Sequence, residues 1–184
     1  MSLRRPFPSR LALLSIALLL AGLAGCGFHL RGAVELPPAA RKVYFSGFAR
    51  DSALGVALEQ QVLRNGGQVL AAPPASATVA ALGIAVWRNE TRRNVLSVDA
   101  SGKASEYELS YIVHFQILSP GGEALTGEQR ILQVRDLFFD ASNVLAKSDE
   151  ENQLRAEMVE AAASQILRQL VTVAREGTPA TRAR

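Results

Sequence analysis

The sequence predicts a single α+β domain that is rich in strands and contains two helices. Three observations support this fold class. Apolar and polar residues alternate through most of residues 107–117, which is the pattern of a half-buried strand. Apolar residues recur at helical spacing in two other segments, residues 54–63 and 149–173. Between these segments lie short runs of Gly, Pro, Asn, Asp and Ser, which are typical of turns.

The alternating segment 107–117 is predicted to be the middle strand of an antiparallel meander. Turn chemistry flanks it in Asp99–Lys103 and Ser119–Gly122, so its partner strands are expected at about 78–98 and 123–139. One face of the strand should lie in the core and the other in solvent. Its apolar side consists of Tyr107, Leu109, Tyr111, Val113, Phe115 and Ile117.

A shorter β-α-β arrangement is expected before the meander. The β-branched and aromatic run Lys42–Ser46 predicts a strand. Asp51 or Ser52 can cap a helix, which Asn65–Gly67 should end, and a short strand at Gln68–Leu70 follows. The apolar residues of this helix are Leu54, Leu58, Val62 and Leu63.

The last predicted element is a helix over residues 149–173, whose apolar residues recur every fourth position and should pack on the sheet. Lys147 is expected just before it. We place the domain at residues 41–175 and expect residues 176–184, which have little apolar content, to be a disordered tail. The apolar stripe is formed by Leu154, Met158, Ala162, Ile166 and Leu170.

Residues 1–25 have the features of a secretion signal. Arginines are followed by an apolar run over residues 11–23, which is shorter than the roughly 20 residues that span hydrocarbon. The tetrapeptide Leu23–Cys26 resembles the lipobox of bacterial lipoproteins, in which the Cys receives a diacylglycerol and its amine is then acylated. The alternative, an ordinary signal with an incidental Cys, leaves unexplained why the only Cys of the chain stands here. The arginines are Arg4, Arg5 and Arg10.

A Cys26 that carries two or more acyl chains would be anchored stably to a membrane, because each buried methylene contributes about 0.8 kcal/mol. Cys26 is followed by Gly27 and not by the Asp that resembles an inner-membrane retention signal. We therefore expect the protein to be anchored at the periplasmic face of the outer membrane of a Gram-negative bacterium. Residues 26–40, which contain adjacent prolines, are expected to form a tether.

Charge and composition argue against several function classes. The signal contains three of the 20 Lys and Arg residues and none of the 17 Asp and Glu residues, which leaves 17 of each sign. A neutral chain gives no reason to expect nucleic-acid binding. With Cys26 committed to lipid, no thiol remains for a disulfide, a metal site or a nucleophile. We expect no cofactor beyond the covalent lipid.

No motif predicts catalysis or a metal site, so we expect a non-enzymatic protein. His29 lies in the tether, and His114 falls on the solvent side of its strand, where a solvated or hydrogen-bonded imidazole is expected. A glycan hydrolase would need two carboxylates at a set separation, and the sequence cannot place Asp136 and Asp140 in that way. Strand-edge or turn roles are the simpler interpretation of both.

Two basic features stand out. Arg88, Arg92 and Arg93 cluster in one predicted strand, and Lys147 precedes the last helix. They fit a solvated strand end, and they also fit a phosphate site, because Arg and Lys bind phosphate well. The residues alone leave both interpretations open.

Four stretches resemble the LPS-assembly lipoproteins, the LptE family. Residues 26–32 (CGFHLRG) look like the start of the mature family members, and Arg92–Asn94, residues 104–109 (ASEYEL) and residues 137–147 (LFFDASNVLAK) agree in order and spacing. The resemblance implies a small mixed, largely antiparallel sheet with two helices on one face. It also implies a one-to-one complex with the outer-membrane β-barrel LptD, in whose lumen members sit, and a role in inserting lipopolysaccharide into the outer leaflet.

Some family members contact lipopolysaccharide itself. Lys147 matches a basic position associated with that contact, whereas a second such position, in the hairpin before residue 104, is not kept, and Lys103 comes slightly later. The hypothesis is that Lys103 and Lys147, with Arg92 and Arg93, form a phosphate-facing patch. The alternatives are a free-standing periplasmic lipoprotein that binds lipid or glycan, and a cell-wall hydrolase.

Overall fold

The computed structural model describes residues 36–76, 79–138 and 144–177. The predicted signal, Cys26 with the first part of the tether, Asp140 and most of the predicted tail lie outside these ranges. The elements follow in the order η1 (Pro38–Ala40), β1 (Lys42–Ser46), α2 (Ala53–Arg64), β2 (Gln68–Leu70), β3 (Leu82–Val98), β4 (Ala104–Leu118), β5 (Gln129–Phe138) and α3 (Val144–Glu176).

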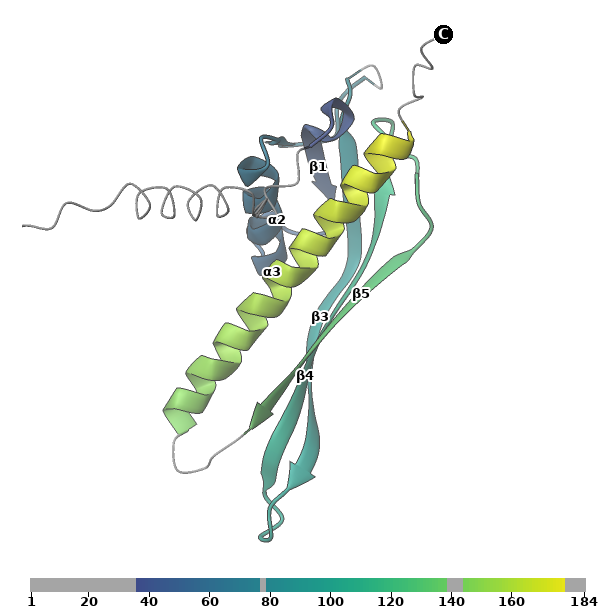
Figure 1. The fold of residues 1–184 in the computed structure, drawn as a ribbon. Coiled ribbons are helices and arrows are strands. Elements are labelled where there is room, and N and C mark those ends of the chain that lie inside the picture. Colours follow the sequence, from purple (N-terminus) through teal and green to yellow (C-terminus); the bar gives the residue numbers. More distant parts are fainter. Residues whose placement is uncertain (1–35, 77–78, 139–143, 178–184) are drawn as a thin grey trace, which may run out of the picture. The chain divides into compact units, whose positions relative to one another are not determined.

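The strands form one mixed five-stranded sheet in the order β2-β1-β3-β4-β5. β1 runs parallel to both β2 and β3, whereas β3, β4 and β5 form an antiparallel meander. Both helices lie on the same face of this sheet (Figure 1). The α+β class and the meander predicted from the sequence are therefore confirmed.

Local signals set the bounds of α2. The Ser52 hydroxyl accepts a hydrogen bond from the N–H of Gly55 at 3.1 Å, which caps the helix. The helix ends at Arg64, and Gly66 continues the chain with φ +75°, a conformation that favours glycine. We expected Leu63 on the buried face, but it is 55% exposed. It follows the buried Val62 by one residue and therefore points about 100° further around the helix.

The last helix is longer than the sequence predicted. α3 begins at Val144 rather than near Asp149, so Lys147 lies inside the helix and not before it. The reason is that residues 144–148 contain neither Gly nor Pro and include the good helix formers Leu, Ala and Lys. The predicted stripe is largely confirmed, since Met158, Ala162, Ile166 and Leu170 are fully buried and Leu154 is partly buried.

The core lies between the sheet and the two helices. It includes Leu36 and Ala40, which we expected in the tether, because η1 packs against α3. The fold therefore begins a few residues earlier than position 41. The largest fully buried side chains of this layer are Leu54, Leu58, Ile84, Leu109, Phe115, Ile117, Leu137, Met158, Ile166, Leu167 and Leu170.

The outer strands of the meander are shorter than predicted. β3 begins at Leu82 rather than near residue 78, and β5 begins at Gln129 rather than at residue 123. Residues 119–128 form a loop that contacts β4 through the bridge between Leu118 and Ala124 and through hydrogen bonds to Ile117 and His114. Since Ser119–Gly122 closes a tight turn within this loop, the turn signal was correct, but the returning strand starts later.

Candidate functional site

The described part of the chain has no helix over one face of the β3–β5 sheet, and we call this the open face. It carries the even-numbered residues of β4 and the residues opposite them in β3 and β5. The odd-numbered residues from Leu109 to Ile117 lie under the helices. The sequence predicted a solvated second face, but Ser110 and Ile112 on it are 6% and 8% exposed, because strands on both sides flank β4.

A row of basic side chains crosses the open face. Arg88 on β3, His114 on β4 and Arg130 on β5 stand directly opposite one another. A β-bulge between Val86 and Arg88 accommodates Trp87, whose ring centroid lies 6.4 Å from that of His114. The sequence analysis missed this row, because the register of three strands, which is not a local signal, brings its members together.

Two carboxylates contact side chains of this row. His114 Nδ1 lies 2.5 Å from Oε1 of Glu128, which confirms the expectation of a hydrogen-bonded imidazole. Arg88 and Arg92 both approach Oε1 of Glu90 at 2.8 Å. The hydrogen bond from Arg88, with the charge of Arg92 beside it, holds the pKa of Glu90 below its usual range. No carboxylate of the described residues forms an ion pair with Arg130.

Arg92 and Arg93, which the sequence analysis grouped together, lie on opposite faces of the sheet. Arg92 is opposite Ser110 on the open face, and Arg93 is opposite Leu109 on the helix side. Arg93 Nη1 donates to Glu151 of α3 at 3.1 Å, and its guanidinium lies 3.7 Å from the centroid of the Tyr107 ring. Arg93 thus connects the first half of α3 to β3.

The two lysines of the predicted patch lie on different elements. Lys147 is in the first turns of α3, where its Nζ lies 2.7 Å from Oε2 of Glu150. Lys103 ends the turn between β3 and β4, and the Asp99 carboxylate accepts hydrogen bonds from the backbone N–H groups of Lys103 and Ser101. These hydrogen bonds and, above all, the one from the Ser101 hydroxyl lower the pKa of Asp99. The Lys103 side chain is exposed.

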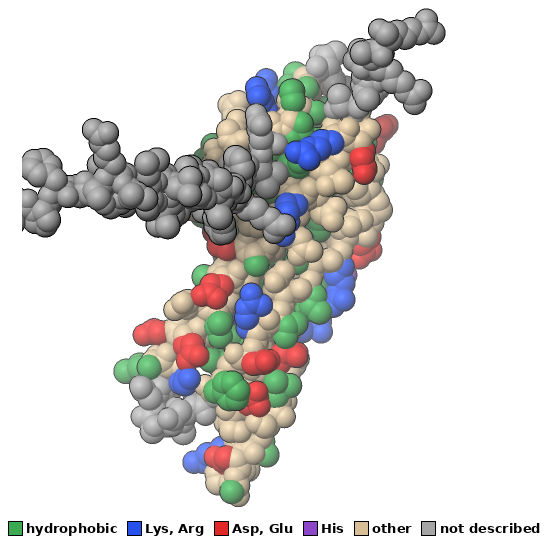
Figure 2. Space-filling view, in the orientation of Figure 1, with side chains coloured by type: hydrophobic (Ala, Val, Ile, Leu, Met, Phe, Trp, Pro, Cys, Tyr) green, Lys and Arg blue, Asp and Glu red, His purple; other side chains and the backbone are tan. Residues whose placement is uncertain are grey.

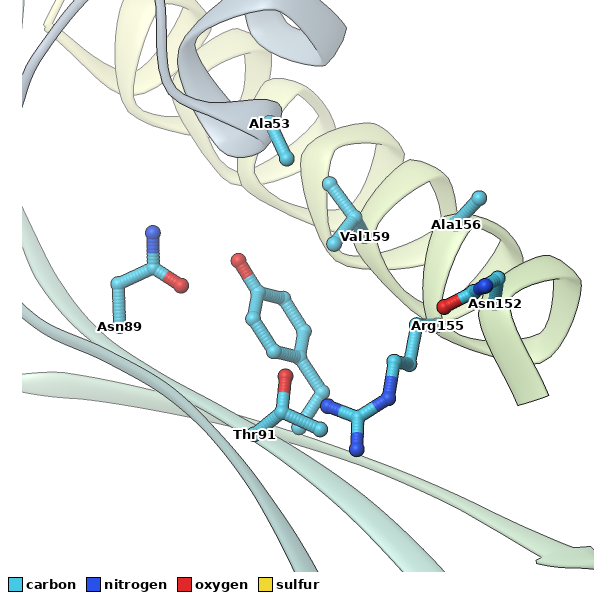
Figure 3. Close-up of a pocket in the computed structure, with 8 residues that line it drawn as sticks. Ala53, Asn89, Thr91, Asn152, Arg155, Ala156 and Val159 are labelled. Atoms are coloured by element: carbon cyan, nitrogen blue, oxygen red, sulfur yellow. The ribbon is translucent and has the colours of Figure 1, made fainter. Parts of the chain in front are cut away.

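A cavity of about 360 Å³ lies on the helix side (Figure 3). Arg155 reaches from α3 toward the strands, and it also donates to Glu151 at 2.6 Å. The Tyr111 hydroxyl is buried without a hydrogen-bond partner among the described residues, and burial raises the pKa of this group. The lining residues are Ala53, Asn89, Thr91, Tyr111, Asn152, Arg155, Ala156 and Val159.

Acidic and basic side chains are interspersed over the side of the molecule that α3 covers (Figure 2). The described ranges contain no group of three or more His, Cys, Asp or Glu side chains that could hold a metal ion. Within those ranges, too, every helix is too short or too polar to cross a bilayer. The most distinctive feature is thus the uncovered sheet face with its basic row.

Comparisons with known proteins agree with this fold. A family model described as LptE, lipopolysaccharide-assembly, matches residues 40–170. The chain is 31% identical over 161 residues to the LPS-assembly lipoprotein LptE of Photorhabdus laumondii, covering 88% of this chain and 84% of that protein. It is 32% identical over 164 residues to the protein of that name in Yersinia enterocolitica, covering 89% of this chain and 77% of that protein.

Solved structures of two lipoproteins share the architecture. The solution structure of lipoprotein B from Nitrosomonas europaea superposes with a TM-score of 0.65 at 31% identity, covering 82% of this chain and 94% of the other. The crystal structure of rare lipoprotein B from Shewanella oneidensis gives a TM-score of 0.62 at 27% identity, covering 73% and 97%.

Proposed function

The chain belongs to the LptE family of lipopolysaccharide-assembly lipoproteins, and we propose that it forms a one-to-one complex with an LptD-like β-barrel of the outer membrane. In this complex it occupies the lumen of the barrel and assists both barrel assembly and the insertion of lipopolysaccharide into the outer leaflet. The role is non-enzymatic. The observation that carries the proposal is the family match over residues 40–170, which includes the whole sheet and most of α3.

The physical properties of the domain suit a barrel lumen. A large barrel encloses a wide aqueous channel whose wall is polar, because its strands alternate apolar residues toward lipid with polar residues toward the lumen. A domain with interspersed charges on the side that α3 covers and with charged side chains on its open face can fill such a channel and form polar contacts with its wall (Figure 2).

We also propose that the chain is held at the periplasmic face of the outer membrane by acyl chains on Cys26, and that it needs no other cofactor. Such an anchor confines the domain to the bilayer that contains the barrel and so raises its effective concentration there. Mass spectrometry of the N-terminal peptide tests this part. A diacylglyceryl and N-acyl mass on Cys26 is the expected result, and an unmodified thiol would contradict it.

Direct contact with lipopolysaccharide is the finer part of the proposal, and it rests on Lys103, Lys147, Arg92 and Arg93. Lys103 is exposed, and its side chain makes no ion pair with the described residues. A phosphate that binds Lys147 would have to compete with the carboxylate of Glu150. It would likewise compete with Glu90 for Arg92 and with Glu151 for Arg93. We therefore expect Lys103→Ala to reduce binding more than Lys147→Ala, and unchanged binding in the double variant would remove this part of the proposal.

The barrel partnership is tested by purification in mild detergent from outer membranes of the natural host, with an affinity tag placed after Arg184. The stoichiometry of any β-barrel that is recovered is then measured. An LptD-like barrel in equal amount is the expected result. Recovery of the lipoprotein alone would contradict the proposal and would favour a free-standing lipoprotein that binds lipid or glycan.

A further inference from the structure

The cavity on the helix side contains a polar group that the described part of the chain does not satisfy. Tyr111 is 3% exposed, and its hydroxyl has no hydrogen-bond partner among the described residues. Buried hydroxyl groups nearly always have a partner, so an unpartnered one that lines a cavity indicates a group that binds there. The cavity volume of about 360 Å³ lies within the range of about 300 to 1,000 Å³ that is typical of small-molecule sites.

The cavity has a buried floor and exposed side chains around it. Tyr111 on β4 and Val159 on α3 form the floor, since Val159 is only 9% exposed. Asn89 on β3 and Asn152 on α3 are exposed, and Figure 3 shows them on opposite sides of the cavity. A small solute can therefore enter from the solvent while the domain stays folded.

Arg155 brings positive charge to this cavity. Among the described residues that line it, only Arg155 is charged. Its Nε and Nη2 donate to Oε1 of Glu151 at 3.1 and 2.6 Å, whereas its Nη1 makes no hydrogen bond within the described chain. The other carboxylate oxygen of Glu151 accepts from Arg93. Two guanidinium groups and one carboxylate therefore leave a net charge of +1 beside the cavity.

The start of α2 also favours negative charge in the cavity. Ala53, the first residue of this 12-residue helix, lines the cavity. The first N–H groups of a helix have no acceptor within it, and together with the helix dipole they favour anions. The Ser52 hydroxyl satisfies the N–H of Gly55. It does not satisfy the N–H of Ala53.

We propose that this cavity binds a small organic acid that carries one carboxylate and several hydroxyl groups. The carboxylate accepts hydrogen bonds from Nη1 of Arg155. The Tyr111 hydroxyl and the amides of Asn89 and Asn152 bind the hydroxyl groups, because each can both donate and accept. This inference goes beyond the proposed function and does not depend on it.

The charge and polarity of the cavity distinguish this ligand from three other classes. A phosphate monoester carries a charge of about −1.5 to −2 at pH 7, which exceeds the net charge of +1 and places its excess near Glu151. A fatty acid would leave the amide of Asn89 and the hydroxyl of Tyr111 buried without partners. A neutral polyol would make no charge-assisted hydrogen bond with Arg155.

Thermal unfolding of the purified mature protein in mild detergent, with gluconate as the probe, tests the inference. Gluconate has one carboxylate and five hydroxyl groups, and a ligand of its size should bind with a dissociation constant of about 1 mM. At about 10 mM it should then raise Tm by about 4 °C. Sorbitol, hexanoate and inorganic phosphate, at the same concentration and at constant ionic strength, should each raise Tm by less than about 1 °C.

Two substitutions in the cavity should weaken gluconate binding about tenfold each. Tyr111→Phe removes the unpartnered hydroxyl, and it should leave Tm without gluconate unchanged because no hydrogen bond is lost. Arg155→Gln removes the charged donor. Tyr44→Phe is the matched control, since the Tyr44 hydroxyl donates to the carbonyl of Ser119 at 2.7 Å. This control should lower Tm and keep the full shift with gluconate.

Three results would overturn the inference. The first is an unchanged Tm with gluconate, together with a crystal structure that shows only water at the Tyr111 hydroxyl. The second is an equal shift with sorbitol, hexanoate or phosphate, which would indicate a different class of ligand. The third is a gluconate shift that Tyr111→Phe and Arg155→Gln both leave intact, which would place the binding elsewhere. The recovery of the barrel is a separate measurement, so each of these results leaves the proposed function standing.

Discussion

Arg93→Ala is expected to loosen the first half of α3 from the sheet. The substitution removes a hydrogen-bonded ion pair to Glu151 at 3.1 Å and a guanidinium that lies 3.7 Å from the centroid of the Tyr107 ring. The Glu151 side chain is 16% exposed, so this ion pair is screened less than one on the surface. Because Arg155 still donates to Glu151 at 2.6 Å, the substitution leaves no unpaired buried carboxylate.

The two lost contacts set the size of the effect. A partly exposed cation–π contact contributes about 1 kcal/mol, and an ion pair that is partly shielded from solvent contributes about another 1 kcal/mol. We therefore expect Arg93→Ala to lower the free energy of unfolding by about 2 kcal/mol and Tm by about 6 °C. Urea unfolding and thermal unfolding of the purified mature protein in mild detergent, both followed by circular dichroism, measure these two changes.

Arg92→Ala is the matched control, because the neighbouring residue lies on the opposite face. Its ion pair with Glu90 is shared with Arg88 and exposed to solvent, so its loss should change the free energy of unfolding by less than about 0.5 kcal/mol. Equal destabilisation by the two substitutions would refute the assignment of Arg92 and Arg93 to opposite faces.

Substitutions at three further positions test other parts of the structure. Gly83→Ala should destabilise by about 1 to 3 kcal/mol in thermal unfolding, because the added Cβ would lie 2.4 Å from Cζ of Tyr44, and a normal Tm would contradict this packing. Ser52→Ala should cost about 1 kcal/mol through loss of the α2 cap, whereas Ser52→Asp should restore most of it. The Glu90 carboxyl has a lower pKa in the folded chain than in the unfolded chain, so its ionised form stabilises the fold. This contribution is fully present above the pKa of the unfolded chain and is lost as pH falls through the pKa of the folded chain. The difference in the free energy of unfolding between the wild type and Glu90→Gln should therefore shrink as the pH is lowered from about 7 to about 3. A difference that stays constant over this range would contradict the prediction.

The first part of the fold was predictable because its signals are local. The bounds of β1 and β2 and the cap of α2 depend on residues within a few positions of each element, such as Ser52 and Asn65–Gly67. The alternation in β4 was also sufficient to identify its buried face. The start of α3 was misplaced, because Asp149 resembles a helix-starting residue while the preceding residues also favour a helix.

The candidate site depended on information that the sequence does not contain locally. The basic row requires the register of β3 against β4 and of β4 against β5, and the bulge at Trp87 shifts that register by one residue. The sequence grouped Arg88, Arg92 and Arg93 by proximity along the chain. Adjacent strand residues point to opposite faces, so only Arg88 and Arg92 share the open face.

The most direct test of the account is the conductance of the barrel with and without this chain. The complex, purified from outer membranes, is inserted into a planar bilayer, and its single-channel conductance is compared with that of the barrel after the lipoprotein has been removed. If the chain fills the lumen, the complex should conduct little and the empty barrel should open a wide aqueous channel. Equal conductance in the two preparations would contradict a position inside the barrel.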